Sequence, residues 1–345
     1  MPGHPQKPKL NLYSTAPQSK DVDRTRYAAR VAEVARWSER AGCQGILVYS
    51  DNGLADPWLV SNIVLQHTSR LCPLVALQPI YMHPYAAAKM VATYAHLYDR
   101  RLCLNLLAGG FKTDLHALND ETPHDDRYNR LTEYALILKQ LLESPEPVTF
   151  AGDYYSVHGL RMNPPLPREL MPSLLISGSS AAGLAAAQDI GATPIKYPQK
   201  PSEEPFQKSH DGNAPGIRVG IIARETAEEA WQVAHQRFPE DHKGKLAHEL
   251  AMKVSDSLWH KQLSSKPSAL DKSRDDVYWL GPFQNYKTFC PYLVGSYEQV
   301  GKEVAAYVDR GYRTFILDIP PCEEELHHSS VVFQEALENS QICHA

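Results

Sequence analysis

The sequence lacks the signatures of several large protein classes. None of its six cysteines (43, 72, 103, 290, 322 and 343) belongs to a C-x-x-C pair, so neither a disulfide framework nor a zinc site of the usual spacing is expected. No apolar run approaches the roughly 18 residues of a membrane-spanning helix. The first residues, MPGHPQKPKLNLYS, contain no apolar leader segment. We therefore expect a cytoplasmic protein with reduced thiols and no membrane partner.

An excess of positive charge is also absent. The chain has 35 Lys and Arg against 40 Asp and Glu, for a net charge of −5, and proteins that bind nucleic acid usually present a basic face. No G-x-S-x-G elbow, Walker loop or G-x-G-x-x-G turn occurs, and the 15 histidines form no H-x-H or H-x-x-x-H group. These absences argue against a nucleic-acid partner, the common hydrolase and nucleotide-binding motifs, and a bound metal.

The chain alternates short apolar runs with longer amphipathic segments. The apolar runs, which predict strands, cover 10–14, 45–50, 71–79, 101–109, 172–178, 216–225 and 312–320. The amphipathic segments, which predict helices, cover 26–42, 56–68, 84–98, 125–144, 179–191, 226–238 and 298–311. Such connectors require parallel strands with crossover connections. The pattern predicts a (β/α)8 barrel, although a doubly wound sheet would give the same alternation.

Three stretches interrupt this rhythm. Residues 149–170 are polar, aromatic and proline-rich, which favours a hairpin. Residues 196–215 and 246–290 show no clean repeat and are expected to be insertions in one domain that spans residues 1–345. Long insertions of this kind often cover active sites, so 246–290 is the predicted lid. The pair His327 and His328 near the C-terminus is interpreted as a solvated helix start.

A possible anion site follows the strand predicted at 172–178. The turn S-G-S-S-A-A-G (177–183) places Ser179 and Ser180 at the start of a helix. Backbone N–H groups and the helix dipole favour a phosphate at such a position. A plain N-cap by either serine explains the same residues. Both interpretations stay open from the local sequence.

His124 and Tyr128 are four residues apart at the start of the helix predicted at 125–144. This spacing puts both side chains on one helix face, where they are able to reach the same phosphate. In the alternative interpretation, Asp125 or Asp126 caps the helix and His124 is merely solvated.

Two polar residues interrupt apolar strands. Asn105 lies within RLCLNLLAG and Arg218 within GIRVGIIARE. A buried amide needs hydrogen-bond partners and a buried guanidinium needs an anion, and a ligand or the protein itself is able to supply either. For Arg218 the structural alternative is an ion pair with Asp56 or another carboxylate.

Taken together, seven segments in order resemble the bacterial luciferase-like flavin monooxygenases, and the alkanesulfonate monooxygenase branch most. The segments are 41–60, 70–94, 102–110, 123–128, 173–191, 216–231 and 291–317. The resemblance implies a (β/α)8 barrel that takes reduced FMN from a separate reductase. It also implies that O2 is used through a flavin C4a-peroxide to oxygenate a second substrate.

The same resemblance implies roles for the residues singled out above. Asn105 would contact the flavin ring or ribityl chain, and the stretch from Ala76 to Gln78 would support the ring face. His124, Tyr128, Ser179 and Ser180 would hold the ribityl–phosphate end. Arg218 would act near the reactive centre. A homo-oligomer, either a dimer or a tetramer, is expected.

The chain departs from the alkanesulfonate branch at its substrate-facing positions. It has Leu54 where that branch has Cys, Gly220 where it has His, and Ile319-Pro320-Pro321 where it has Tyr-x-His. An alkanesulfonate substrate is therefore not expected. The preferred prediction is a small organic or carrier-tethered intermediate of secondary metabolism. Two alternatives remain on the same fold, which are a deazaflavin (F420)-dependent oxidoreductase and a non-catalytic flavin-binding relative.

Overall fold

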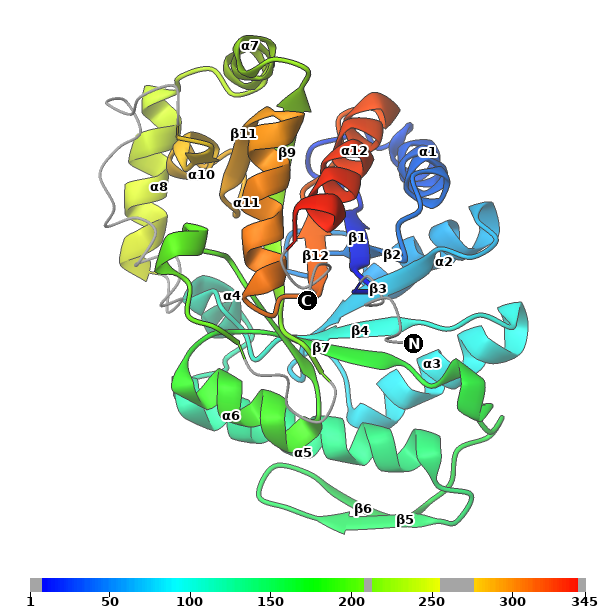
Figure 1. Ribbon diagram of the computed structural model, residues 1–345. Coiled ribbons are helices and arrows are strands. Elements are labelled where there is room, and N and C mark those ends of the chain that lie inside the picture. The colour runs from blue at the N-terminus through cyan, green and yellow to red at the C-terminus, as the bar shows by residue number, and fades with distance from the viewer. Residues whose placement is uncertain (1–7, 208–212, 255–275, 341–345) are drawn as a thin grey trace. The chain divides into compact units, whose positions relative to one another are not determined.

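The computed structural model describes residues 8–207, 213–254 and 276–340 (Figure 1). The chain forms two compact units. The first unit contains the chain up to Thr15, Arg40–Cys43 and the chain from Ile195 onward. The second unit contains Ala16–Glu39 and Gln44–Pro194.

The second unit alternates parallel strands with helices. Its strands are β2 (Gly45–Val48), β3 (Cys72–Leu77), β4 (Cys103–Leu106), β5 (Val148–Ala151), β6 (Ser156–Leu160) and β7 (Ser173–Ser177). Its helices are α1 (Tyr27–Arg40, with its last residue in the first unit), α2 (Pro57–His67), α3 (Pro84–Tyr98), α4 (Lys112–Ala117), α5 (His124–Glu143), η1 (Arg168–Leu170) and α6 (Ala181–Ile190). β2, β3, β4 and β7 pair in this order as parallel neighbours.

Local sequence explains where these helices begin and end. Asp56 accepts hydrogen bonds from two backbone N–H groups of α2, and Pro57 occupies its first turn. α3 likewise begins with a proline, Pro84. α6 is capped by Ser180 and ends at Gly191, which has a positive φ of 69°. α3 and α6 each pack beside α5, and the three helices bury apolar side chains against β4 and β7.

The first unit has a second set of strands, which are parallel except at one edge. Its strands are β1 (Asn11–Thr15), β8 (Thr193–Lys196, which starts in the second unit), β9 (Gly216–Arg224), β10 (Tyr278–Trp279), β11 (Tyr292–Ser296) and β12 (Thr314–Leu317). Its helices are η2 (Pro201–Glu203), α7 (Ala227–Arg237), α8 (His242–Val254), α10 (Gly281–Gln284), α11 (Tyr297–Asp309) and α12 (Glu323–Asn339). β1 pairs with β12, β12 with β9, and β9 with both β8 and β11, all parallel. At the edge, the short β10 pairs antiparallel with β11.

The alternation predicted from the sequence is confirmed, with shorter elements at several ends. The hairpin expected within 149–170 is β5 and β6, which pair antiparallel. The pattern missed β8, β11 and the helices α4 and α8, and it placed the start of α12 at His327 and His328, one turn too late. Of the predicted lid, residues 255–275 lie outside the described residues, and the remainder includes part of α8, β10 and α10.

The interpretation of the histidine pair as a solvated helix start holds for the exposure of His327 but is wrong for His328 and for the position of the helix start. His328 lies inside α12, its side chain is 12% exposed, and its Nδ1 is hydrogen-bonded to the Tyr297 hydroxyl at 2.6 Å. The helix begins at Glu323. The negative charges of the three glutamates in its first turn interact favourably with the positive end of the helix dipole. Among the described residues, no helix is long and apolar enough to cross a membrane.

Candidate functional site

In the second unit, two adjacent strands, β3 and β4, carry Ala76 and Asn105, which are predicted to meet the cofactor ring. Ala76 of β3 lies directly opposite Asn105 of β4, which in turn lies opposite Leu175 of β7. Asn105 is 4% exposed, and its Oδ1 accepts a hydrogen bond of 2.9 Å from the Ser177 hydroxyl. The neighbouring strand β7 therefore supplies one hydrogen-bond partner of the buried amide, as expected if the protein and not a ligand satisfies it.

Gln78 follows β3 at its C-terminal end and is buried. Its Nε2 donates to the Ser50 carbonyl at 3.4 Å. Beyond β4, Gly109 adopts a φ of 100°, and a side chain there would press on Leu115. Gln78 and Gly109 thus shape the ends of β3 and β4, the edge at which parallel α/β sheets bind ligands.

Tyr128 of α5 reaches the start of α6. Its hydroxyl is hydrogen-bonded to the Ser180 side chain, and its ring is buried. A Cβ at Gly178 would overlap the Tyr128 hydroxyl, and one at Gly183 would lie 3.2 Å from it. Burial raises the pKa of Tyr128, which therefore stays a proton donor at neutral pH.

Ser180 has two partners here. Its hydroxyl also accepts a hydrogen bond of 3.1 Å from the Gly183 amide, so it is the N-cap of α6. Ser179 precedes it and is partly exposed. The structure brings Tyr128 and Ser180 together, and Ser179 is the residue before Ser180. Capping and anion binding are thus compatible at this turn.

His124 is the first residue of α5. Its ring packs against that of Tyr128 with centroids 5.2 Å apart, and its Nδ1 is 2.7 Å from the Asp125 carboxylate. Neither Asp125 nor Asp126 caps the helix, because the N-cap is Pro123 and has no side-chain hydrogen bond. His124 and Tyr128 therefore share one face, and the role proposed for them stays a prediction.

The residues around this turn fit a phosphate-bearing cofactor. Gly178 and Gly183 leave the space that Tyr128 occupies, and two hydroxyl groups meet at the positive end of a ten-residue helix. Hydroxyl and backbone N–H donors at a helix N-terminus are the groups that bind phosphate without a metal.

In the first unit, Arg218 lies near the middle of β9 and is 6% exposed. One guanidinium nitrogen is 3.4 Å from Asp318 Oδ1, and another donates to the Tyr197 hydroxyl at 3.4 Å. The carboxylate anticipated for a structural pair is thus Asp318. Asp56, named as the first possibility, instead caps α2.

Asp318 directly follows β12 and is held by three side chains. Its Oδ2 accepts hydrogen bonds from the Thr288 and Tyr292 hydroxyls, the latter at 2.8 Å. Burial alone would raise its pKa. The Arg218 guanidinium and the two hydroxyls outweigh burial and lower the pKa of Asp318, which stays ionised.

The lowered pKa of Asp318 determines the pH range over which its ion pair with Arg218 stabilises the protein. A carboxyl group with a depressed folded-state pKa adds stability above its unfolded-state pKa and loses it as the pH falls through the folded value. We expect the stability difference between the wild type and Asp318→Asn to be constant from about pH 8 to 5 and to shrink only below about pH 4. Urea denaturation of both proteins across this range measures it, and a difference that already declines at pH 6 would contradict the assignment.

Gly220 and Tyr292 form a second arrangement that the sequence did not reveal. They are opposite each other in the pairing of β9 with β11, and a Cβ at Gly220 would overlap the Tyr292 ring. The ring also packs edge-on against Phe238 at 5.0 Å, with the Arg237 guanidinium 5.6 Å from its centre. Gly220 is therefore the residue that admits Tyr292 to its place beside Asp318.

Gly220→Ala is expected to destabilise the protein by about 1–3 kcal/mol, because the Tyr292 ring must shift and its hydrogen bond to Asp318 is then lost. Thermal and chemical denaturation measure the loss. Gly110→Ala is the matched control, since nothing lies within 4 Å of a Cβ there. Equal stability of the two variants would contradict the packing described.

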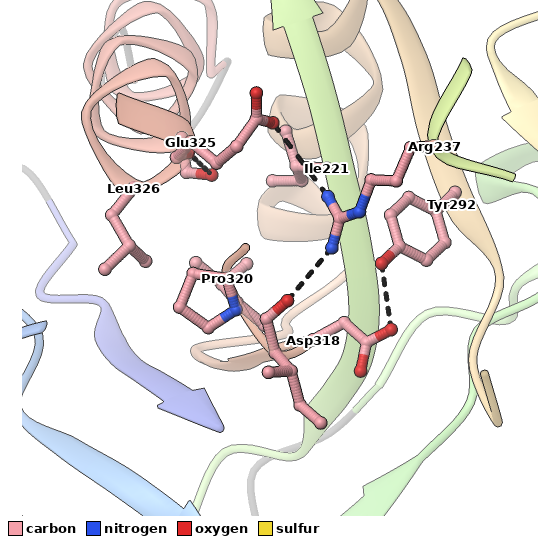
Figure 2. A pocket seen from close by; sticks show the side chains of 10 residues that line it. Ile221, Arg237, Tyr292, Asp318, Pro320, Glu325 and Leu326 are labelled. Carbon is pink, nitrogen blue, oxygen red and sulfur yellow. Dashed lines mark hydrogen bonds and ion pairs between the residues drawn. The ribbon is translucent and has the colours of Figure 1, made fainter. Parts of the chain in front are cut away.

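A small pocket of about 20 Å³ opens beside Asp318 (Figure 2). Figure 2 shows the Tyr292 hydroxyl facing Asp318, while Arg237 lies between Glu325 and the chain at Pro320. Arg237 donates to the Ile319 carbonyl at 2.9 Å. Ile319 and Pro320 form part of the pocket wall.

Sequence reasoning missed the groups around Arg218, namely Tyr197, Thr288, Tyr292 and Asp318. Asp318 alone carried a signal, because an acidic residue at the C-terminal end of an apolar strand lies at the usual ligand-binding edge. The others come from stretches without a clear strand or helix pattern.

Comparison with known proteins identifies the family and agrees with this fold. The family model "Luciferase-like monooxygenase" matches residues 9–314. The 4-(γ-L-glutamylamino)butanoyl-[BtrI acyl-carrier protein] monooxygenase BtrO from Niallia circulans is 37% identical over 321 residues, which are 91% of this chain and 92% of BtrO.

Two solved structures establish the fold. EDTA monooxygenase from Chelativorans sp. BNC1 superposes with a TM-score of 0.73 at 15% identity, covering 95% of this chain and 93% of its own. An F420-dependent secondary alcohol dehydrogenase superposes with a TM-score of 0.67 at 16% identity, covering 95% and 99%. The predicted (β/α)8 fold class is confirmed, and the chain belongs to the luciferase-like monooxygenase family, as an oxidoreductase of the monooxygenase class.

Proposed function

We propose that the protein is a two-component monooxygenase that uses reduced FMN from a separate reductase and O2 to oxygenate an acyl intermediate carried by an acyl-carrier protein. The observation that carries this proposal is the similarity to BtrO, which extends over nine-tenths of both chains. The name of BtrO describes an acyl group on a carrier protein rather than an alkanesulfonate. Biosynthesis of a secondary metabolite is the proposed setting.

The second unit supplies the groups proposed to hold FMN. Tyr128 and Ser180 would donate hydrogen bonds to its phosphate, aided by the N-terminal dipole of α6, and His124 and Ser179 would flank them. Asn105, Ala76 and Gln78 would face the ring and ribityl chain. Reduced FMN, when bound, supplies the electrons that activate O2. Arg218 would orient the reacting substrate group, and Asp318 would hold Arg218 in place.

The test is a reconstituted reaction on a defined probe. An acyl-carrier protein loaded with the 4-(γ-L-glutamylamino)butanoyl group is incubated with the enzyme, FMN, NADH, a flavin reductase and isotopically labelled O2. Mass spectrometry of the carrier should show the gain of one labelled oxygen atom on the acyl group. The same acyl group as a free acid is the comparison, and we expect it to react poorly. Labelled product from the free acid but none from the carrier would overturn the proposed tethering.

Likeness to an F420-dependent dehydrogenase motivates a second candidate. In that case a deazaflavin would transfer hydride without O2. Strictly anaerobic turnover with reduced F420, and none with reduced FMN and O2, would favour this candidate. Flavin binding with no turnover under either condition would favour the non-catalytic alternative.

A further inference from the structure

Arg218 faces an anion that belongs to the protein itself. Asp318 lies 3.4 Å from the guanidinium, and both side chains are nearly buried, at 7% and 11% exposed. The carboxylate is not a loose surface group that a ligand readily displaces. Thr288 and Tyr292 hold its second oxygen, and Gly220 leaves the room that lets Tyr292 do so.

This arrangement changes what Arg218 is able to bind. An isolated buried guanidinium attracts any small anion, because its charge has lost the solvation of water. Beside Asp318 the two charges compensate each other over a short distance. A second anion entering there would approach a fixed carboxylate of the same sign, and such juxtaposition in a desolvated site is strongly unfavourable.

We propose that Asp318 is a specificity-determining residue, an internal anion that occupies Arg218 so that the substrate group received beside this pair is uncharged. A thioester or amide carbonyl fits this requirement, whereas a sulfonate or a free carboxylate does not. The substrate class rests on the proposed function, in which Arg218 orients the reacting group. The occupancy of Arg218 by Asp318 does not rest on it.

The experiment removes the internal anion and looks for the gain of an anion site. Asp318→Ala removes the carboxylate beside Arg218, and Asp318 itself lines the pocket of Figure 2. Calorimetric titration with acetate and with methanesulfonate, at constant ionic strength, is compared with the wild type. We expect binding at least about tenfold tighter in the variant. Asp318→Ala combined with Arg218→Gln should lose this gain.

A matched control separates this effect from a general one. Glu323→Ala also removes a carboxylate 2.6 Å from an arginine, Arg40, but both side chains are about half exposed. Because water solvates Arg40, no comparable gain is expected there. Thr288→Val and Tyr292→Phe remove hydrogen bonds yet keep the charge of Asp318, so they should not create an anion site either.

The proposal remains testable if Asp318→Ala does not fold. Asp318→Asn keeps the shape of the side chain and removes the charge, and it should show the same gain. The wild type provides a third measurement. If it binds methanesulfonate and Arg218→Gln abolishes that binding, Arg218 is open to anions and the proposal is overturned. No change in anion affinity on neutralising Asp318 also overturns it.

These titrations contain no flavin, carrier or O2, so they are independent of the catalytic assay. If oxygenation fails but the Asp318 variants still gain anion binding, the proposed function alone is rejected. A labelled product on the carrier, together with no gain of anion binding in either Asp318 variant, would reject the internal anion alone.

Discussion

Arg218→Ala should lower the free energy of unfolding by about 3–5 kcal/mol, the cost typical of leaving one partner of a buried ion pair without its counter-charge. Asp318 would stay buried and would keep the Thr288 and Tyr292 hydroxyls and the weaker attraction of the Arg237 charge. Because its lowered pKa depends first on Arg218, part of the loss should appear as protonation of Asp318 at a higher pH. Urea denaturation, monitored by tyrosine and tryptophan fluorescence, measures the change.

Arg218→Lys separates catalysis from stability. Lysine keeps the positive charge for Asp318 but loses the planar donor geometry of a guanidinium. If Arg218 orients substrate, the yield of oxygenated product per NADH consumed should fall, and peroxide should rise, in a protein that melts near the wild type. Full coupling in Arg218→Lys, alongside a large stability loss in Arg218→Ala, would instead make Arg218 a scaffold residue.

The double variant Tyr128→Phe, Ser180→Ala lacks both hydroxyls at the start of α6. It should bind FMN at least tenfold more weakly than the wild type. Each hydrogen bond to a charged phosphate is worth about 1.5–3 kcal/mol. Affinity for riboflavin, which has no phosphate, should change little. Anaerobic titration with reduced FMN and with reduced riboflavin measures both.

Ser180 also caps α6, so the double variant needs a control for helix stability. Thr226→Ala removes the equivalent cap of α7, where Thr226 accepts a hydrogen bond of 3.3 Å from the Glu229 amide. It should cost about 1 kcal/mol of stability without changing the ratio of FMN to riboflavin affinity. Equal affinity of the wild type for FMN and riboflavin would remove the phosphate assignment.

Periodicity predicted those elements whose ends are marked by local chemistry. The helix expected at 84–98 matches α3 residue for residue, because proline opens it and Asp99 ends it in a left-handed conformation. β8 was missed since its four residues include a proline and do not alternate clearly. The start of α12 was placed one turn too late because its first turn is acidic and its apolar face emerges only further along.

In the candidate site, too, residues placed by local spacing were predicted, and partners placed by strand pairing were not. Tyr128 and Ser180 were found because each lies at a helix start, where spacing within a few residues determines the geometry. The anion beside Arg218 was not found, because Asp318 is 100 residues away in sequence and joins it only through the pairing of β9 with β12. Contacts set by strand register are not encoded in any local pattern.

The overlap between position 220 and the Tyr292 ring also constrains the order in which this enzyme is able to acquire substitutions. Any side chain introduced at Gly220 meets the ring first, whatever benefit it would bring to the substrate pocket. A smaller residue must therefore replace Tyr292 before position 220 becomes open to variation, and that first step releases one hydrogen bond to Asp318. We expect the two positions to be epistatic, with the path through a smaller residue at position 292 less destabilising than the path through position 220. Libraries that randomise Gly220 alone should return glycine, whereas paired libraries of positions 220 and 292 should reach new sequences.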